Sequence, residues 1–199
     1  MAPRRPEQFE AIREKSREKI LAASLELFAN KGYDATSIDN IAKKAGISKG
    51  LIYNYFESKK SILLAIFDDA MKMGEELLMG QMNIKDPVLR KKAIIELTFD
   101  MIKQRPDYVK FLTVMALQPG VMADTKDFTK NAYKKTEEWG KLITGKAKKE
   151  AVIDTLMIGA MMDGITLNFI IYGEQYPLDE LKKEIIKLYC GPEKKKKKK

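Results

Sequence analysis

The chain of 199 residues contains no histidine and only one cysteine, Cys190. Without histidine there can be no Ser-His-Asp or Cys-His catalysis, and no zinc or haem held by an imidazole ligand. A single cysteine excludes an intramolecular disulfide and a CxxC metal motif, and it fits a reducing compartment, which we expect to be the cytoplasm. Since the sequence has no phosphate-binding loop or metal cluster either, we expect neither an enzyme nor a bound cofactor or metal.

Long apolar runs are also missing from the sequence. None reaches the roughly 18 residues of a membrane-spanning helix, and residues 1–6 lead into charged sequence rather than into the apolar core of a signal peptide. Apolar residues make up 45% of the chain, which is typical of globular proteins. The sequence therefore predicts a globular protein without a membrane partner, of a length that suits one large domain or two small ones.

Positive charge is in excess, with 37 Lys and Arg residues against 28 Asp and Glu residues, but it is unevenly placed. Residues 1–60 carry 12 basic and 8 acidic side chains, while residues 194–199 are all lysine. A basic balance favours a nucleic-acid partner. We expect the lysine tail to be disordered. The tail also leaves open an alternative function, that of a helical protein which binds nucleic acid without sequence preference.

Apolar residues recur at spacings of three and four nearly everywhere, and no stretch alternates apolar and polar residues as a half-buried strand does. This pattern, interrupted by proline and glycine, predicts an all-α fold of about nine helices. Their expected ranges are 7–30, 37–45, 49–56, 59–82, 87–104, 106–118, 124–143, 147–172 and 177–189. We expect a first domain over residues 1–58, a second over residues 59–193, and the tail over residues 194–199.

The segment 36–56 has the pattern of a helix-turn-helix. Ala42 allows two helices to cross closely, Gly46 four residues later permits the turn, and isoleucines around them supply a shared core. Thr36 and Ser48 stand where N-caps are expected, and helix N-termini suit phosphate groups. The outward face of the second helix could enter a DNA major groove about 12 Å wide. That face carries Lys49, Gly50, Tyr53 and Asn54.

Residues 17–69 resemble the N-terminal domain of the TetR family of bacterial transcriptional repressors. Two strings carry the resemblance, Ile20-Leu-Ala-Ala-x-x-x-Leu-Phe-Ala-x-Lys-Gly-Tyr33 and Ala35-Thr-Ser-Ile-x-x-Ile-Ala-Lys-x-Ala-Gly-Ile-Ser-Lys-Gly-Leu-Ile-Tyr-Asn-Tyr-Phe-x-Ser-Lys59. The resemblance implies a repressor that binds a palindromic operator as a homodimer, and it implies contacts to phosphate or to base edges. The implied contacts are Thr36, Ser48 and Lys59 to phosphate, Lys49, Gly50 and Tyr53 to bases, and Asn54 and Tyr55 to either.

A basic extension precedes the matching region. Residues 1–16 contain Arg4, Arg5, Arg13 and Lys15. One interpretation is an arm that reaches the DNA minor groove. The other is a flexible tail or an additional turn of the first helix.

The last two helices are candidates for a dimer interface. The apolar residues Leu178, Leu181, Ile185 and Leu188 repeat at spacings of three, four and three, as in a seam that faces a partner helix. Members of the TetR family pair through their last two helices, so the resemblance implies a homodimer. The alternative is that these four side chains form the internal core of one subunit.

Members of the family usually bind a small molecule among their central helices, so the resemblance implies an effector. Aromatic and methionine side chains between residues 87 and 172 suit a lipophilic or aromatic ligand. Asp163 is the polar candidate, because it interrupts an apolar run. The apolar candidates are Phe99, Met101, Phe111, Met115, Trp139, Met161, Met162, Phe169 and Tyr172. The alternatives are that these residues are ordinary core, and that a partner protein regulates the chain.

Overall fold

The computed structural model describes residues 6–191, and it describes the side chains of residues 10–147 and 149–191. Within that part of the chain every regular element is helical, which confirms the predicted all-α fold. There are ten α-helices, where about nine were expected, and one short 3-10 turn. They are α1 (Pro6–Lys31), α2 (Ile38–Ala45), α3 (Lys49–Tyr53), α4 (Lys59–Met79), α5 (Pro87–Gln104), α6 (Pro106–Ala116), α7 (Pro119–Asp124), α8 (Lys126–Thr144), α9 (Lys148–Tyr172), η1 (Gly173–Gln175) and α10 (Leu178–Cys190).

The additional helix, α7, lies where the sequence predicts only a Pro-Gly turn. Pro119 occupies the first helical position, where its missing N–H is not needed. The backbone N–H of Thr125 ends the helix by donating to the carbonyl of Val121 at 2.9 Å. Another difference is that α3 stops at Tyr53, because the N–H of Asn54 turns back to the third preceding carbonyl rather than the fourth.

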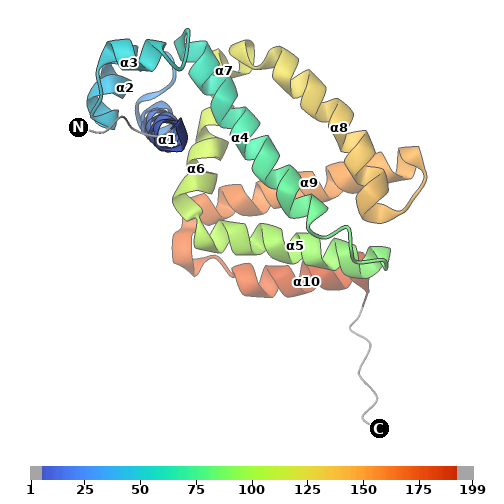
Figure 1. Ribbon diagram of the computed structural model, residues 1–199. Coiled ribbons are helices and arrows are strands. Elements are labelled where there is room, and N and C mark those ends of the chain that lie inside the picture. The colour runs from blue at the N-terminus through green and yellow to red at the C-terminus, as the bar shows by residue number, and fades with distance from the viewer. Residues whose placement is uncertain (1–5, 192–199) are drawn as a thin grey trace. The chain divides into compact units, whose positions relative to one another are not determined.

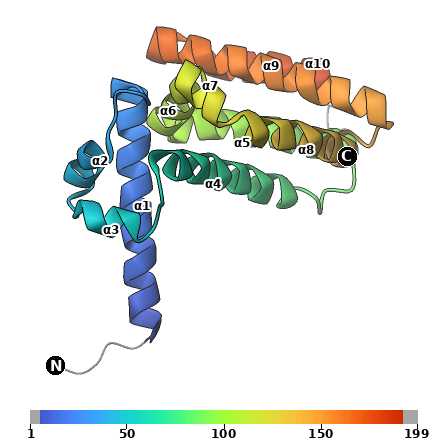
Figure 2. The ribbon, with the colours of Figure 1, turned by 90° about the horizontal axis from the view of Figure 1, so that it is seen from above.

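The first compact unit consists of the chain up to Met71 together with Phe111–Asp127. Within it, α2 lies beside the C-terminal half of the long helix α1, and α3 follows α2 near the middle of α1 (Figure 1 and Figure 2). Burying a large apolar side chain stabilises a fold by roughly 1.5–3 kcal/mol, so the shared core fixes α2 and α3 on α1. The buried apolar side chains include Ile20, Leu25, Leu27, Phe28, Ile41, Ile52, Ile62 and Leu63.

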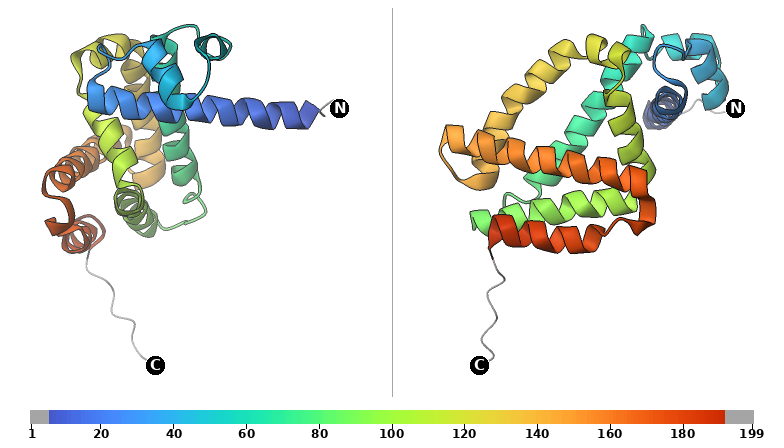
Figure 3. Two further views of the ribbon diagram at one scale, coloured as in Figure 1. Left: turned by 90° about the vertical axis from the view of Figure 1, so that its left-hand side faces the viewer. Right: turned by 180° about the vertical axis from the view of Figure 1, so that it is seen from behind.

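The second compact unit consists of Lys72–Lys110 and the chain from Phe128 on. In it α5 and α10 run antiparallel side by side, and α9 packs against them (Figures 1 and 3). All three helices contribute apolar side chains at spacings of three or four to one core. The buried members are Ile95, Phe99, Ile102, Met162, Ile165, Leu178 and Ile185.

These units divide the chain differently from the expected boundary between residues 58 and 59. The first part of α4 belongs with the helix-turn-helix. Its Asp69 carboxylate accepts two hydrogen bonds from the guanidinium of Arg17 on α1, at 3.1 and 3.0 Å. The helix α4 therefore begins in one compact unit and ends in the other, with the division after Met71.

The helix α9 combines an apolar composition with high exposure. By length and composition alone the stretch Lys149–Gln175 could cross a membrane, yet only 17% of its most apolar window is buried in the described part of the chain. One such helix is weak evidence for a membrane, and Asp163 lies in the middle of it. The exposed apolar side chains recur along one face of the helix, which is typical of a contact surface. They include Ile153, Leu156, Met157, Ala160, Leu167 and Ile171.

Candidate DNA-binding surface and ligand cleft

The turn between α2 and α3 has the geometry of a helix-turn-helix. Gly46 ends α2 with a φ of 66°, a left-handed conformation that glycine adopts without steric penalty, and its N–H bonds back to helix carbonyls. Ser48 is the N-cap of α3, as predicted, because its hydroxyl accepts from the N–H of Leu51 at 3.2 Å. Ile41 and Ile52, one from each helix, are both 0% exposed. The two helices therefore share one core.

The N-cap of α2 is Ser37, so the prediction of an N-cap at Thr36 is wrong by one residue. Ser37 and Asn40 form a reciprocal capping box, in which each side-chain oxygen accepts from the other residue's N–H at 3.1 Å. Thr36 is 1% exposed, and its hydroxyl donates to the carbonyl of Gly32 at 2.8 Å. Because that hydroxyl is turned into the fold, the exposed side chain at the start of α2 is Ser37 and not Thr36.

The exposed face of α3 carries the four residues that the sequence placed there, Lys49, Gly50, Tyr53 and Asn54. Tyr53 is 49% exposed, and a Cβ added at Gly50 would meet nothing within 4 Å. The Lys49 ammonium donates to the Asp39 carboxylate at 2.8 Å, and this hydrogen bond raises the pKa of Lys49. Lys49 is therefore a charged donor on the surface, held by Asp39 in the absence of DNA.

Tyr55 is half-buried and lies beneath the guanidinium of Arg13, whose central carbon is 6.0 Å from the ring centroid. Arg13 belongs to α1, so residues 6–16 form additional turns of the first helix. That is the second of the two interpretations of the extension. A minor-groove arm stays a prediction for Arg4 and Arg5, which lie outside the described residues.

The Lys59 side chain forms hydrogen bonds within the first compact unit. Its ammonium donates to the backbone carbonyls of Tyr33 at 2.7 Å and Asp34 at 3.3 Å, and it stands 4.4 Å from the centroid of the Tyr33 ring. Two of its three N–H groups are thereby directed to the turn between α1 and α2. The geometry favours a role in holding that turn, whereas the resemblance implied a phosphate contact.

We expect Lys59→Met to lower the free energy of unfolding by about 1–3 kcal/mol, because the Tyr33 carbonyl loses a charged donor. Urea unfolding measures this change, with Lys19→Met as the control, since Lys19 is exposed on α1. If Lys59 contacts DNA phosphate instead, we expect the opposite result for Lys59→Met. Stability would then equal that of the parent, while the slope of log affinity against log salt would fall by about one unit.

The residues predicted to line an effector pocket differ widely in their exposure. Phe99 and Met115 are 1% and 0% exposed, so they are core residues of their units. Tyr172 is 59% exposed and stacks on Tyr176 with ring centroids 6.1 Å apart. Asp163 is exposed on α9. Met162 is 8% exposed in the core of the second unit, and the partly buried residues of the set are Phe111, Trp139, Met161 and Phe169.

An apolar cleft of about 220 Å³ lies between α4 and α5 in the second unit. Met101 is the one residue of the sequence-based set that lines it. Gly74 also lines it, and a Cβ built there meets no atom within 4 Å, so it would project into free space. The full lining consists of Gly74, Leu77, Leu78, Ile94, Leu97, Thr98 and Met101. No pattern in the sequence predicts this cleft, because its residues have the spacing of the ordinary apolar faces of two helices.

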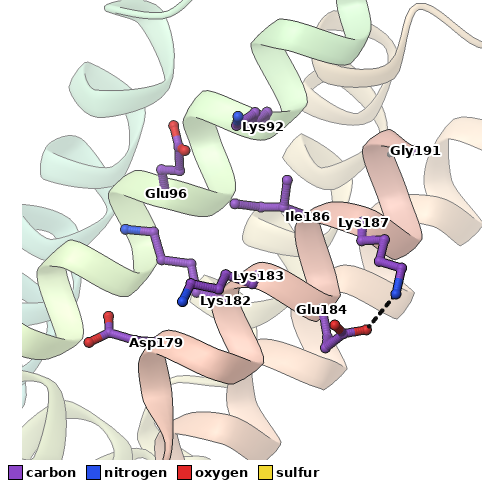
Figure 4. A pocket seen from close by; sticks show the side chains of 9 residues that line it. All are labelled: Lys92, Glu96, Asp179, Lys182, Lys183, Glu184, Ile186, Lys187 and Gly191. Atoms are coloured by element: carbon purple, nitrogen blue, oxygen red, sulfur yellow. Dashed lines mark hydrogen bonds and ion pairs between the residues drawn. The ribbon is translucent and has the colours of Figure 1, made fainter. Parts of the chain in front are cut away.

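Two larger hollows in the second unit are open and charged. One, of about 860 Å³, lies where α5 and α6 meet the end of α9, and Phe169 lines it beside Lys103 and Asp107. The other, of about 670 Å³, is a groove along α5 and α10 (Figure 4). Four lysines and three acidic residues alternate along this groove, so it does not suit a lipophilic ligand. They are Lys92, Lys182, Lys183, Lys187, Glu96, Asp179 and Glu184.

Only some of the four side chains predicted to form a dimer interface on α10 are exposed. Leu178 and Ile185 are 5% and 6% exposed, because they pack against α5 in the core of their own chain. Within one chain both side chains therefore belong to the internal core, which is the alternative stated above, and their place in a dimer interface stays a prediction. Leu181 is partly buried against the same core, whereas Leu188 is 72% exposed. Spacings of three and four reveal an apolar face but not which neighbour covers it.

A capped helix-turn-helix with an exposed second helix, joined to a second helical unit, is the architecture of DNA-binding helix-turn-helix proteins. The family model described as bacterial regulatory proteins, tetR family, matches residues 20–66. Over these residues the chain is similar to that family. It is 33% identical to the uncharacterized HTH-type transcriptional regulator YerO of Bacillus subtilis over 133 residues, which are 63% of this chain and 43% of that protein. This match thus spans less than half of the relative's length.

Solved structures share the fold over nearly the whole chain. The fatty acid degradation regulator FadR from Bacillus halodurans has a TM-score of 0.72 at 20% identity, covering 97% of this chain and 99% of that chain. FadR from Bacillus subtilis, solved in complex with stearoyl-CoA, has a TM-score of 0.70 at 20% identity, covering 88% of this chain and 98% of that chain. At this level of identity the likeness concerns the fold alone.

Proposed function

We propose that the protein is a homodimeric transcriptional repressor that binds a palindromic operator through α2 and α3 and is released by a lipophilic small molecule. The observation that carries the proposal is the exposed face of α3 in a capped helix-turn-helix. Lys49 and Tyr53 supply hydrogen-bond donors for base edges or phosphate. Gly50 between them lets the helix backbone come close to the bases.

Pairing of two copies is supported by the exposed apolar face of α9 and by Leu188 on α10. One head contacts one half-site, so a palindromic operator needs two heads set one helical turn or a multiple of it apart. Identical apolar faces related by a two-fold axis cover each other. The small residues Gly159, Ala160 and Gly164 on α9 would let two such helices approach closely.

A long-chain acyl thioester is the effector class to test first. FadR from Bacillus subtilis shares the fold and was solved with stearoyl-CoA, and the cleft between α4 and α5 is lined by apolar side chains. Its 220 Å³ fall below the roughly 300–1,000 Å³ of typical ligand pockets. An acyl chain must therefore widen the cleft. Because α4 is one continuous helix, its displacement would reach the part that belongs with the helix-turn-helix.

Selection from random DNA duplexes, followed by fluorescence anisotropy, tests the DNA-binding part of the proposal. We expect a palindrome whose half-sites are centred about 10 bp or a multiple apart. Deleting residues 194–199 should leave the sequence preference unchanged. If the preference vanishes with the tail, or if the parent shows none, the alternative of non-specific nucleic-acid binding is the better one.

Titration of the protein–operator complex with stearoyl-CoA tests the effector. We expect release of the DNA, and we expect Gly74→Leu to suppress that release, because its side chain fills the cleft while operator affinity stays at the parent value. A Leu89→Ala variant is the control, since Leu89 is 56% exposed on α5 outside the cleft lining. Equal release from the parent and Gly74→Leu would place the ligand elsewhere. If no acyl thioester or other small molecule releases the DNA, regulation by a partner protein becomes the better hypothesis.

The proposal includes the absence of an enzymatic activity and a site of action in the bacterial cytoplasm. Its support is that the related proteins are bacterial transcriptional regulators, whose target is the chromosome. A broad screen for hydrolase turnover by the purified protein would test the first point, and any turnover that follows the protein through purification would contradict it.

A further inference from the structure

Gln118, the residue before α7, is bonded to the turn that precedes α2. Its Oε1 accepts from the backbone N–H of Tyr33 at 2.6 Å, and its Nε2 donates to the carbonyl of Phe28 at 2.8 Å. One side-chain amide thus pairs the N–H of Tyr33, just beyond the end of α1, and shares the carbonyl of Phe28 with the N–H of Gly32, which donates to it at 3.1 Å. Gln118 is 85 and 90 residues away from these partners in the sequence.

Tyr33 is the second point of attachment between this turn and α7. Its side chain is 3% exposed, its ring meets that of Phe28 edge-on at 5.0 Å, and its hydroxyl donates to Asp124 at the end of α7 at 2.7 Å. Asp124 also pairs with Lys60 on α4 at 3.4 Å. The two ends of α7 are therefore bonded to the same turn.

These bonds hold over a wide range of pH. Burial and then the bond to Asp124 raise the pKa of Tyr33, while the Tyr33 hydroxyl lowers the pKa of Asp124. The raised pKa of Tyr33 gives a stabilisation that is present below its ordinary pKa near 10 and lost at higher pH. The lowered pKa of Asp124 gives one that is present above its ordinary pKa near 4 and lost at lower pH. The attachment is thus insensitive to pH between about 5 and 9.

Between these two attachment points, α7 also lies close to the turn between α1 and α2. A Cβ added at Gly120 would overlap the carboxylate of Asp34, so any side chain there would displace that of Asp34. Lys59 holds the same turn from α4, through the carbonyls of Tyr33 and Asp34. The turn between α1 and α2 is therefore fixed by α4 and by α7 together.

We propose that Gln118 and Asp124 are positioning residues for DNA binding, because through them α7 clamps the turn that sets the orientation of α2 and α3. The inference rests on the proposed function. The clamp also has a place in the chain that suits regulation. The helix α7 joins α6 to α8, and both of these helices continue into the second compact unit. The chain therefore connects that unit covalently to α7, and the hydrogen bonds of Gln118 and Asp124 connect α7 to the turn.

The test compares full-length Gln118→Ala with Met122→Ala, a control on α7 whose side chain is 61% exposed. Amide hydrogen exchange, followed by NMR without DNA, should be at least about tenfold faster at Tyr33 in Gln118→Ala, since its N–H has lost its acceptor. Operator affinity, measured well below the unfolding temperature, should fall about tenfold with unchanged sequence preference and salt slope. Tyr33→Phe, which removes only the bond to Asp124, should show a smaller loss of affinity, and Met122→Ala should match the parent in both measurements.

Hydrogen exchange at Tyr33 and operator affinity together show which part of the proposal fails. Unchanged exchange at Tyr33 in Gln118→Ala would overturn the clamp itself. Faster exchange with parent-like operator affinity would overturn the positioning role and leave Gln118 as a residue of structural importance only. A parent that binds no selected duplex would overturn the proposed function, and the positioning role with it, while the exchange data would still report whether the clamp exists.

Discussion

Gly50→Ala should unfold at a higher urea concentration than the parent and yet bind the operator about tenfold to a hundredfold more weakly. The stability rises because glycine inside a helix is roughly 0.5–1 kcal/mol less favourable than alanine, and because the added Cβ meets nothing within 4 Å. The affinity falls because the methyl group stands on the exposed face of α3, where the backbone has to approach the bases. A lost base contact is worth about 1–3 kcal/mol, which sets the range of the expected loss.

The matched control for this prediction is Gly74→Ala. Gly74 is also a helical glycine whose added Cβ meets nothing within 4 Å, but it lies on α4, in the second compact unit. It should gain a similar stability and keep the operator affinity of the parent. Measured together, urea unfolding and anisotropy separate packing from DNA contact. A Gly50→Ala protein with higher stability and unchanged operator affinity would contradict the placement of Gly50 against the bases.

The helix-turn-helix could be predicted from the sequence because its determinants are local. The turn glycine Gly46, the cap Ser48 and the buried isoleucines all lie within the segment 36–56, and each has a physical preference that its neighbours reinforce. The error in the first N-cap, Thr36 in place of Ser37, has the same origin. Both residues make good N-caps, and the choice between them depends on which hydroxyl the fold turns inward.

The contacts of the second unit and of α7 could not be predicted in this way. Helical spacing identified apolar faces correctly, but it assigned Leu178 and Ile185 to a partner chain, whereas α5 of the same chain covers them. The partners of Gln118 are 85 and 90 residues away, and no local pattern marks a glutamine for such contacts. Aromatic and methionine residues occur both in protein cores and in ligand pockets. Their composition therefore could not locate the cleft between α4 and α5.

The second large effect concerns the exposed face of α9. We expect Leu167→Glu to give a folded monomer that binds the operator at least about a hundredfold more weakly. Leu167 is 43% exposed, so within one chain the new carboxylate meets water and the fold should tolerate it. In a two-fold dimer the same change introduces one carboxylate from each copy into an apolar surface. Removing each ion from water is disfavoured by several kcal/mol, and every 1.4 kcal/mol is about a factor of ten in the association constant.

The effect on DNA follows from the loss of pairing. When two heads are joined, the second half-site is bound at a high effective concentration, and this advantage disappears for a monomer. Sedimentation velocity at micromolar concentration measures the pairing, and anisotropy measures operator affinity. The matched control is Leu142→Glu on α8, since Leu142 is 41% exposed and lies outside the α9 face. Both the dimer and its operator affinity should survive in that variant. A dimeric Leu167→Glu protein would mean that the two copies pair through a surface other than α9, and Leu188 on α10 would then be the next residue to replace.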